Sequence, residues 1–279
     1  MTRAERTTAS TRNFPGAVRS PSAVAAAPRR DRVLIAICIV LITALAWAYL
    51  LHLHRRMSSS IEADSMMETM GMVMNQPWGA GEVAVTFVMW AVMMVGMMSP
   101  SALPVLLLFA GAHARRTGRG VPLAALLFGL GYIAVWVGFS ACAALAQWAL
   151  HQAALLSSTM ATSSSRLAGA ILVAAGAYQL TPLKVGCLTR CRSPLGFLLS
   201  NWRDGASGAF RMGLGHGVFC LGCCWALMGV LFVVGVMNLA WVGVLAVFIL
   251  VEKVGSTGVR VARLGGAVLI ALGAFVVLR

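Results

Sequence analysis

The chain has 279 residues, of which 59% are apolar and 11% are charged, with a formal net charge of +14. A typical soluble domain carries roughly 25% charged residues, so this composition excludes a soluble globular protein. It also excludes disorder throughout, which requires low hydrophobicity. With no Gly-X-Y repeat and only seven cysteines, collagen and disulfide scaffolds are excluded as well. We therefore predict an all-α, polytopic membrane helix bundle.

The apolar runs predict about seven transmembrane helices behind a basic tail. Residues 1–31 are rich in Ala, Ser, Thr, Arg and Pro and predict a disordered tail, and residues 32–279 form the predicted bundle. The fourth and sixth spans are short, and the count falls to six if Gly213–Val251 is not two helices. The predicted spans are Val33–Leu51, Val83–Gly111, Val121–Leu150, Leu167–Thr181, Gly213–Val234, Asn238–Val251 and Leu264–Leu278.

The basic residues predict a cytoplasmic N-terminus. If seven helices alternate from there, the only Lys and Arg on the outer side are Arg55, Arg56, Arg166 and Arg279. Such a bias is what the positive-inside rule describes. These residues lie in short loops without interleaved aromatic residues, which favours attraction to anionic lipid over nucleic-acid binding. We expect the lipid bilayer, and no nucleic acid, as a partner.

Residues 52–82 are predicted to form an outer loop that is rich in methionine. Thioether sulfur is a soft ligand that suits Cu(I), and His52 and His54 add nitrogen donors. An amphipathic interfacial segment, with methionine as flexible filler, explains the composition equally well. The methionines of this loop are Met57, Met66, Met67, Met70, Met72 and Met74.

The second predicted span carries two adjacent rows of methionine. Pro100 removes a backbone donor in the middle of this span, which predicts a break that faces protein rather than lipid. Methionine that fills gaps between helices is the ordinary explanation, and the thiols elsewhere in the chain favour a metal instead. The rows consist of Met89, Met93 and Met97, spaced four residues apart, with Met94 and Met98 beside them.

The fifth predicted span has the strongest pattern. Its soft donors fall within about a third of the helix circumference, and four nearby glycines let other helices approach. Three thiols and one imidazole suit Cu(I) or Zn(II). Cys220 and Cys223 have a dithiol spacing that also suits redox chemistry, and small buried cysteines are the plain alternative. The donors are Met212, His216, Cys220, Cys223 and Cys224.

The predicted inner loop 183–209 carries a second cysteine pair, Cys187 and Cys191. The inner compartment is reducing, so we expect free thiols or a metal site here rather than a disulfide. If the loop is helical, both sulfurs lie on one face and are placed to exchange a soft metal with Cys220. Glu252, at the end of the sixth span, is expected to be a solvated helix end, with a ligand that faces the bundle as the alternative.

Three segments resemble a known family: MWAVMMVGMMSPS, YQLTPLKVGCLTRCRSP and MGLGHGVFCLGCCWALM. Together with Glu252-Lys253 they are similar to the bacterial "predicted metal-binding integral membrane protein" family, domain of unknown function 2182, over roughly residues 80–278. Gly96 departs from the expected Ala. The resemblance implies a multi-pass protein of the bacterial inner membrane with a metal site. The positions that match its motifs are His216, Cys220, Cys223, Cys224, Cys187, Cys191, Met93, Met94, Met97 and Met98.

We therefore predict an inner-membrane protein that binds a soft metal ion, Cu(I) in preference to Zn(II), for transport, insertion or buffering. A periplasmic or cytoplasmic metal carrier is the expected partner. The chain has no ATP-binding or aspartyl-phosphate motif, so movement of the ion would follow a gradient or a partner. The alternatives are a thiol–disulfide or electron-transfer protein that uses Cys220 and Cys223, and an accessory subunit without an ion.

Overall fold

The computed structural model describes residues 28–69, 78–156, 161–255 and 257–278, and of residues 57–69 it describes the backbone alone. These residues are helical apart from short connections and one isolated β-bridge, which confirms the all-α class. The helices in chain order are α1 (Arg29–Thr69), α2 (Ala80–Thr117), α3 (Val121–Gln152), α4 (Ser165–Leu180), α5 (Pro182–Arg192), α6 (Pro194–Asn201), α7 (Gly205–Gly229), α8 (Leu231–Val234), α9 (Leu239–Val254) and α10 (Gly258–Leu278).

Among the described residues, five stretches of helix are long and apolar enough to cross a membrane: Arg29–Arg56, Ala80–Thr117, Val121–Gln152, Gly205–Val234 and Gly258–Leu278. A sixth span results if α4 and α5, which meet at an angle of 63°, count as one broken span. The chain is thus a multi-pass membrane protein. The expected seventh span is not reached, because α9 has 16 residues and a bilayer core needs about 20.

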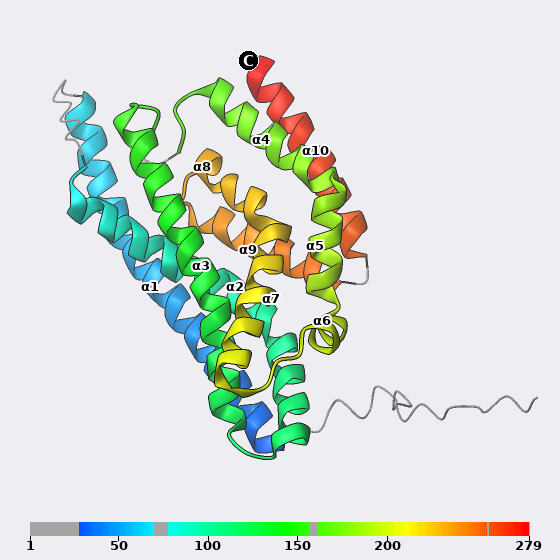
Figure 1. Cartoon of the computed structure of the whole chain (residues 1–279). Helices are drawn as coiled ribbons and strands as arrows, with labels where there is room; N and C mark the ends of the chain where they lie inside the picture. The colour runs from blue at the N-terminus through cyan, green and yellow to red at the C-terminus, as the bar shows by residue number, and fades with distance from the viewer. Residues whose placement is uncertain (1–27, 70–77, 157–160, 256, 279) are drawn as a thin grey trace, which may run out of the picture.

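Neighbouring helices pack through glycine. Figure 1 shows α3 beside α7 and α4 beside α10, at opposite sides of the molecule. A Cβ atom added to Gly131 of α3 would lie 2.9 Å from the backbone nitrogen of Leu214 on α7. One added to Gly176 of α4 would lie 2.6 Å from the carbonyl oxygen of Gly266 on α10. The small residues therefore allow the close backbone approach on which helix association in a bilayer depends.

Basic side chains from separate parts of the sequence share one end of the bundle. Arg116, at the end of α2, pairs with Asp204 before α7 at 3.9 Å. Arg29 and Arg32, at the start of α1, line a cavity together with Leu107 of α2. These contacts bring together three parts of the chain that were expected on the same side of the membrane: the start of α1, the end of α2 and the connection before α7.

Residues 52–69, which were expected in an outer loop, continue α1 as helix. The stretch from His52 to Thr69 contains no glycine or proline, the residues that most readily end a helix. The side chains of Met57, Met66 and Met67, and all of Met70, Met72 and Met74, lie outside the part that the structure describes.

The segment expected as an inner loop, 183–209, is largely helical and packs into the bundle as α5 and α6. The Thr181 hydroxyl accepts the backbone N–H of Lys184 at 3.2 Å, and Pro182 occupies the first turn, so α5 starts directly after the bend. Lys184 and Leu188 are fully buried. Because α5 lies against α7, it brings Cys187 and Cys191 to the fifth predicted span.

Candidate metal centre

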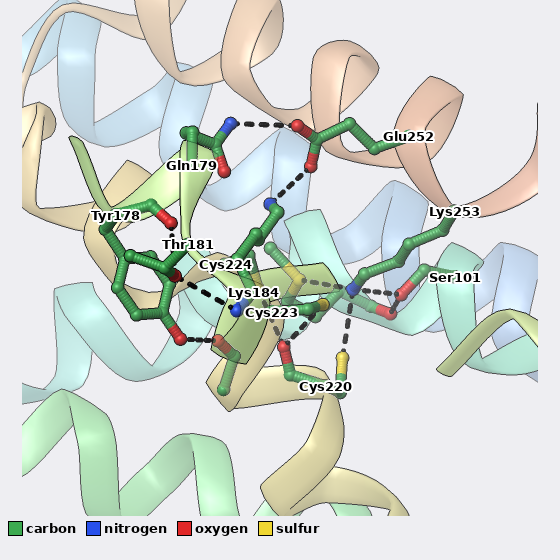
Figure 2. Close-up of polar contacts among 12 residues, drawn as sticks. Ser101, Tyr178, Gln179, Thr181, Lys184, Cys220, Cys223, Cys224, Glu252 and Lys253 are labelled. Atoms are coloured by element: carbon green, nitrogen blue, oxygen red, sulfur yellow. Dashed lines mark hydrogen bonds and ion pairs between the residues drawn. The ribbon is translucent and has the colours of Figure 1, made fainter. Parts of the chain in front are cut away.

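Cys220 lies at the centre of the cluster of soft donors. It is buried in α7, and two other helices contact its sulfur. The hydroxyl of Tyr132 on α3 lies 3.0 Å from the Cys220 Sγ. The Lys253 ammonium on α9 donates to the same atom at 2.9 Å, as Figure 2 shows. The expectation that the thiol face of this helix points into the protein is confirmed.

Further thiols surround Cys220. The Sγ atoms of Cys223 and Cys224 each donate to the Cys220 carbonyl oxygen at 3.0 Å. From α5, the Cys191 thiol lies beside Cys220 and Cys223. Cys187, one turn earlier, lies against α7, because a Cβ atom at Gly222 would be 2.9 Å from its sulfur. Both cysteine motifs of the sequence therefore meet in one place.

These thiols are close together without forming a ready coordination shell. In the part of the chain that the structure describes, no group of three or more His, Cys, Asp or Glu side chains is placed to hold a metal ion. The Lys253 ammonium instead occupies one side of the Cys220 sulfur. Binding of an ion at this sulfur therefore requires the side chains to rearrange.

His216 lies one helical turn before Cys220 and is 2% exposed. The rings of Phe197 and Tyr132 surround it at centroid distances of 5.3 and 6.0 Å. Among the described residues, its Nδ1 atom has no hydrogen-bond partner. A buried nitrogen that lacks a partner is costly. The Nδ1 atom of His216 is therefore available to bind a ligand.

The methionines of α2 are buried as expected. The sulfur of Met98 lies 3.7 Å from the Lys253 Nζ, which places the end of the methionine rows beside Cys220. At the other end, Met89 and Met237 line a cavity of about 290 Å³ with Glu82. Helix α2 is continuous through both of its prolines, so the expected break at Pro100 is wrong. The buried methionines of the rows are Met89, Met93, Met94, Met97 and Met98.

Glu252 is not the solvated helix end that was expected. It is fully buried, and it accepts hydrogen bonds from the Lys184 ammonium at 2.7 Å and from the Gln179 amide at 2.9 Å (Figure 2). The expectation was wrong because α5, predicted as a surface loop, carries a cation into the interior. Charges buried in a membrane bundle are costly unless they are paired, and this pair meets that condition.

Two residues that contact Cys220 were missed in the sequence, Lys253 and Tyr132. A usable signal for the first was its rarity: the chain has 20 arginines and only two lysines, and both lysines stand beside motifs that had been singled out. The Lys253 ammonium also donates to the hydroxyl of Ser101 at 3.2 Å. Tyr132 has no local signal, because its role depends on how α3 packs on α7.

Comparison with known families agrees with this arrangement. The model of the PpoB2 family, described as a copper chaperone, matches residues 87–276, which include α3, α5, α7 and α9. A search of curated proteins and a search of solved structures each found no match. The predicted resemblance is confirmed as far as a membrane family concerned with copper, and the particular family name given above is not. The chain belongs to the PpoB2 copper chaperone family.

Proposed function

We propose that the protein binds Cu(I) in the interior of the bundle through thiols drawn from the set Cys191, Cys220 and Cys223, and that it hands the ion to a partner protein. The observation that carries the proposal is the convergence of thiols from α5 and α7 beside the methionine rows of α2. Copper is here the cargo and not a resident cofactor. The membrane we propose is the bacterial inner membrane.

The chemistry of the donors favours Cu(I). Thiolate and thioether sulfur are soft ligands that suit Cu(I), whereas Zn(II) in structural sites takes four ligands in a closed tetrahedral shell. The unpartnered Nδ1 of His216 lies one helical turn from Cys220 and is a nitrogen donor that an ion can use during transfer. Cys187 and Cys224 border the same centre and extend the set of sulfur atoms that an ion can use during transfer.

The methionine rows suggest a route for the ion. They run along α2 from the cavity lined by Met89 and Met237 to Met98 beside Lys253. With the arginine-rich end of the bundle in the cytoplasm, as the positive-inside rule requires, this cavity lies on the outer side. We propose that thioethers pass Cu(I) between the outer side and the thiols.

Metal content tests the proposal. The purified protein, extracted in mild detergent and loaded with Cu(I) under anaerobic conditions, is expected to retain copper after desalting. Cys220→Ser and Cys223→Ser are expected to lose it. Cys142→Ser is the matched control, because this cysteine is exposed on α3 and stands apart from the cluster. A wild-type protein that retains no soft metal would end the proposal.

A second function is supported by the same closeness of the thiols. Cys191 and either Cys220 or Cys223 can form a disulfide if two electrons and two protons pass to an external acceptor. Alkylation separates the two functions. Thiols of the protein as isolated that become reactive only after a Cu(I) chelator is added were held by metal, whereas thiols that become reactive only after a reductant is added were in a disulfide.

A further inference from the structure

The two lysines of the chain are both buried, and their partners differ. Lys184 pairs with the carboxylate of Glu252 at 2.7 Å. Lys253 meets no carboxylate among the side chains that the structure describes, those of residues 28–56, 78–156, 161–255 and 257–278. Its neighbours are Cys220 Sγ at 2.9 Å, Ser101 Oγ at 3.2 Å and Met98 Sδ at 3.7 Å (Figure 2). Because the charges of Lys184 and Glu252 cancel, Lys253 leaves one positive charge beside a thiol.

A buried ammonium is costly unless an anion lies next to it. Ser101 and Met98 are neutral, so the anion has to be formed by sulfur at Cys220. This is also the atom at which the cargo is proposed to bind. The position of Lys253 therefore bears on the charge that the loaded centre carries.

We propose that Lys253 is the counter-ion of a Cu(I) complex with two thiolates, one of which is Cys220. One Cu⁺ and two thiolates sum to −1, the thiol protons leave to water, and the ammonium restores neutrality. The second thiolate is that of Cys191, which lies beside Cys220, or that of Cys223, whose sulfur lies 3.0 Å from the Cys220 carbonyl oxygen. This inference rests on the proposed function and specifies the bound form: an anionic dithiolate complex and not Cu⁺ among neutral thioethers.

The charge of Lys253 has opposite effects on the Cu(I) affinity of the two bound forms, the anionic dithiolate complex and Cu⁺ among neutral thioethers. The ammonium stabilises an anionic complex at Cys220, and it repels Cu⁺ that is held by the neutral sulfur of Met98. Removal of the charge therefore weakens binding in the first case and strengthens it in the second. The effect is large in either case, because charges interact strongly where water is excluded.

The experiment measures Cu(I) affinity in detergent, under anaerobic conditions, by competition with a colorimetric Cu(I) chelator. Lys253→Leu, which removes the charge without adding a sulfur donor, is expected to weaken binding by about tenfold or more, and Lys253→Arg, which keeps the charge, by no more than about threefold. Ser101→Ala is the matched control, since it removes a neutral partner of the ammonium and leaves the charge in place. X-ray absorption of the loaded wild-type protein is expected to show two sulfur ligands.

Unchanged or tighter binding in Lys253→Leu overturns the inference and leaves the proposed function standing, provided that Cys220→Ser still loses copper. A wild-type protein that does not bind Cu(I) overturns the proposed function instead. If Lys253→Leu does not elute as a folded species, Lys253→Gln is compared with Lys253→Arg by the same criterion. If neither neutral variant folds, X-ray absorption decides, because a nitrogen ligand or a third ligand contradicts the dithiolate complex.

Discussion

Glu252 and Lys253 are consecutive residues of α9, and their side chains bind different helices. The Glu252 carboxylate holds Lys184 of α5 at 2.7 Å, whereas the Lys253 ammonium donates to Cys220 of α7 at 2.9 Å. Consecutive residues of a helix point about 100° apart, so one helix end reaches both neighbours. The helix that carries Cys191 and the helix that carries Cys220 are thus held together through α9.

Glu252→Gln is expected to destabilise the fold strongly. The change leaves the Lys184 ammonium buried without a counter-charge, and breaking a buried pair in this way costs about 3–5 kcal/mol. The melting temperature of the protein in detergent measures the effect. Asp204→Asn is the control, because it breaks a pair with Arg116 whose side chains are 57% and 79% exposed and which contributes about 0–1 kcal/mol. Equal shifts in the two variants would contradict this account.

Gly131→Ala is expected to disturb the contact between α3 and α7. The new Cβ atom would lie 2.9 Å from the backbone nitrogen of Leu214, and overpacking of this kind costs about 1–3 kcal/mol. Gly129→Ala, on the same helix, meets no described atom within 4 Å and is expected to leave stability unchanged or raise it by up to about 1 kcal/mol. Melting curves of both variants test this difference, and the packing argument fails if the order of stability is reversed.

Gly222→Ala is expected to displace the Cys187 side chain. The added Cβ atom would lie 2.9 Å from the Cys187 sulfur, which is half-buried and free to turn away from α7. Alkylation of Cys187 by a small maleimide, followed by mass spectrometry, should therefore become faster. Gly229→Ala, later in α7, has open space within the described residues and should leave the rate unchanged. An unchanged rate in Gly222→Ala would show that Cys187 does not rest on this glycine.

Tyr132→Phe is expected to weaken Cu(I) binding by about fivefold, because it removes one polar contact to sulfur with a typical net contribution of about 1 kcal/mol. The hydroxyl lies 3.0 Å from the Cys220 sulfur, and the ring remains to fill its place. Tyr178→Phe is the control, since that hydroxyl donates to the carbonyl oxygen of Gly222 and not to a thiol. Chelator competition measures both variants, and an equal loss in both would argue against a specific role for Tyr132.

Local patterns were sufficient to predict the membrane class and the inward face of α7. His216 and Cys220 are four residues apart, and both are buried, as the helical period requires. The methionines of α2 follow the same rule. Periodicity within one helix succeeds here because a span that is mostly apolar can only hide its polar side chains against other helices.

The contacts between helices were not predictable in the same way. The meeting of Cys191 with Cys220 depends on the bend of 63° after α4, which turns an apparent loop into a buried helix. Glu252 and Lys253 look like an ordinary charged helix end, and only the packing of α5 and α7 around them gives each a partner. The seventh expected span is not shown, because the apolar run at α9 forms a helix of only 16 residues, shorter than a bilayer core needs.

Because Lys184 and Lys253 are both buried, chemical labelling of their amino groups measures how often the helix bundle opens. The other basic side chains are arginines and five histidines, and neither gives a stable product with amine-reactive esters. Apart from a terminal amine, such a reagent reaches an amino group only when the helices around α9 separate. The rate at which label enters these two lysines therefore follows transient exposure of the centre, without the introduction of any dye site by mutation.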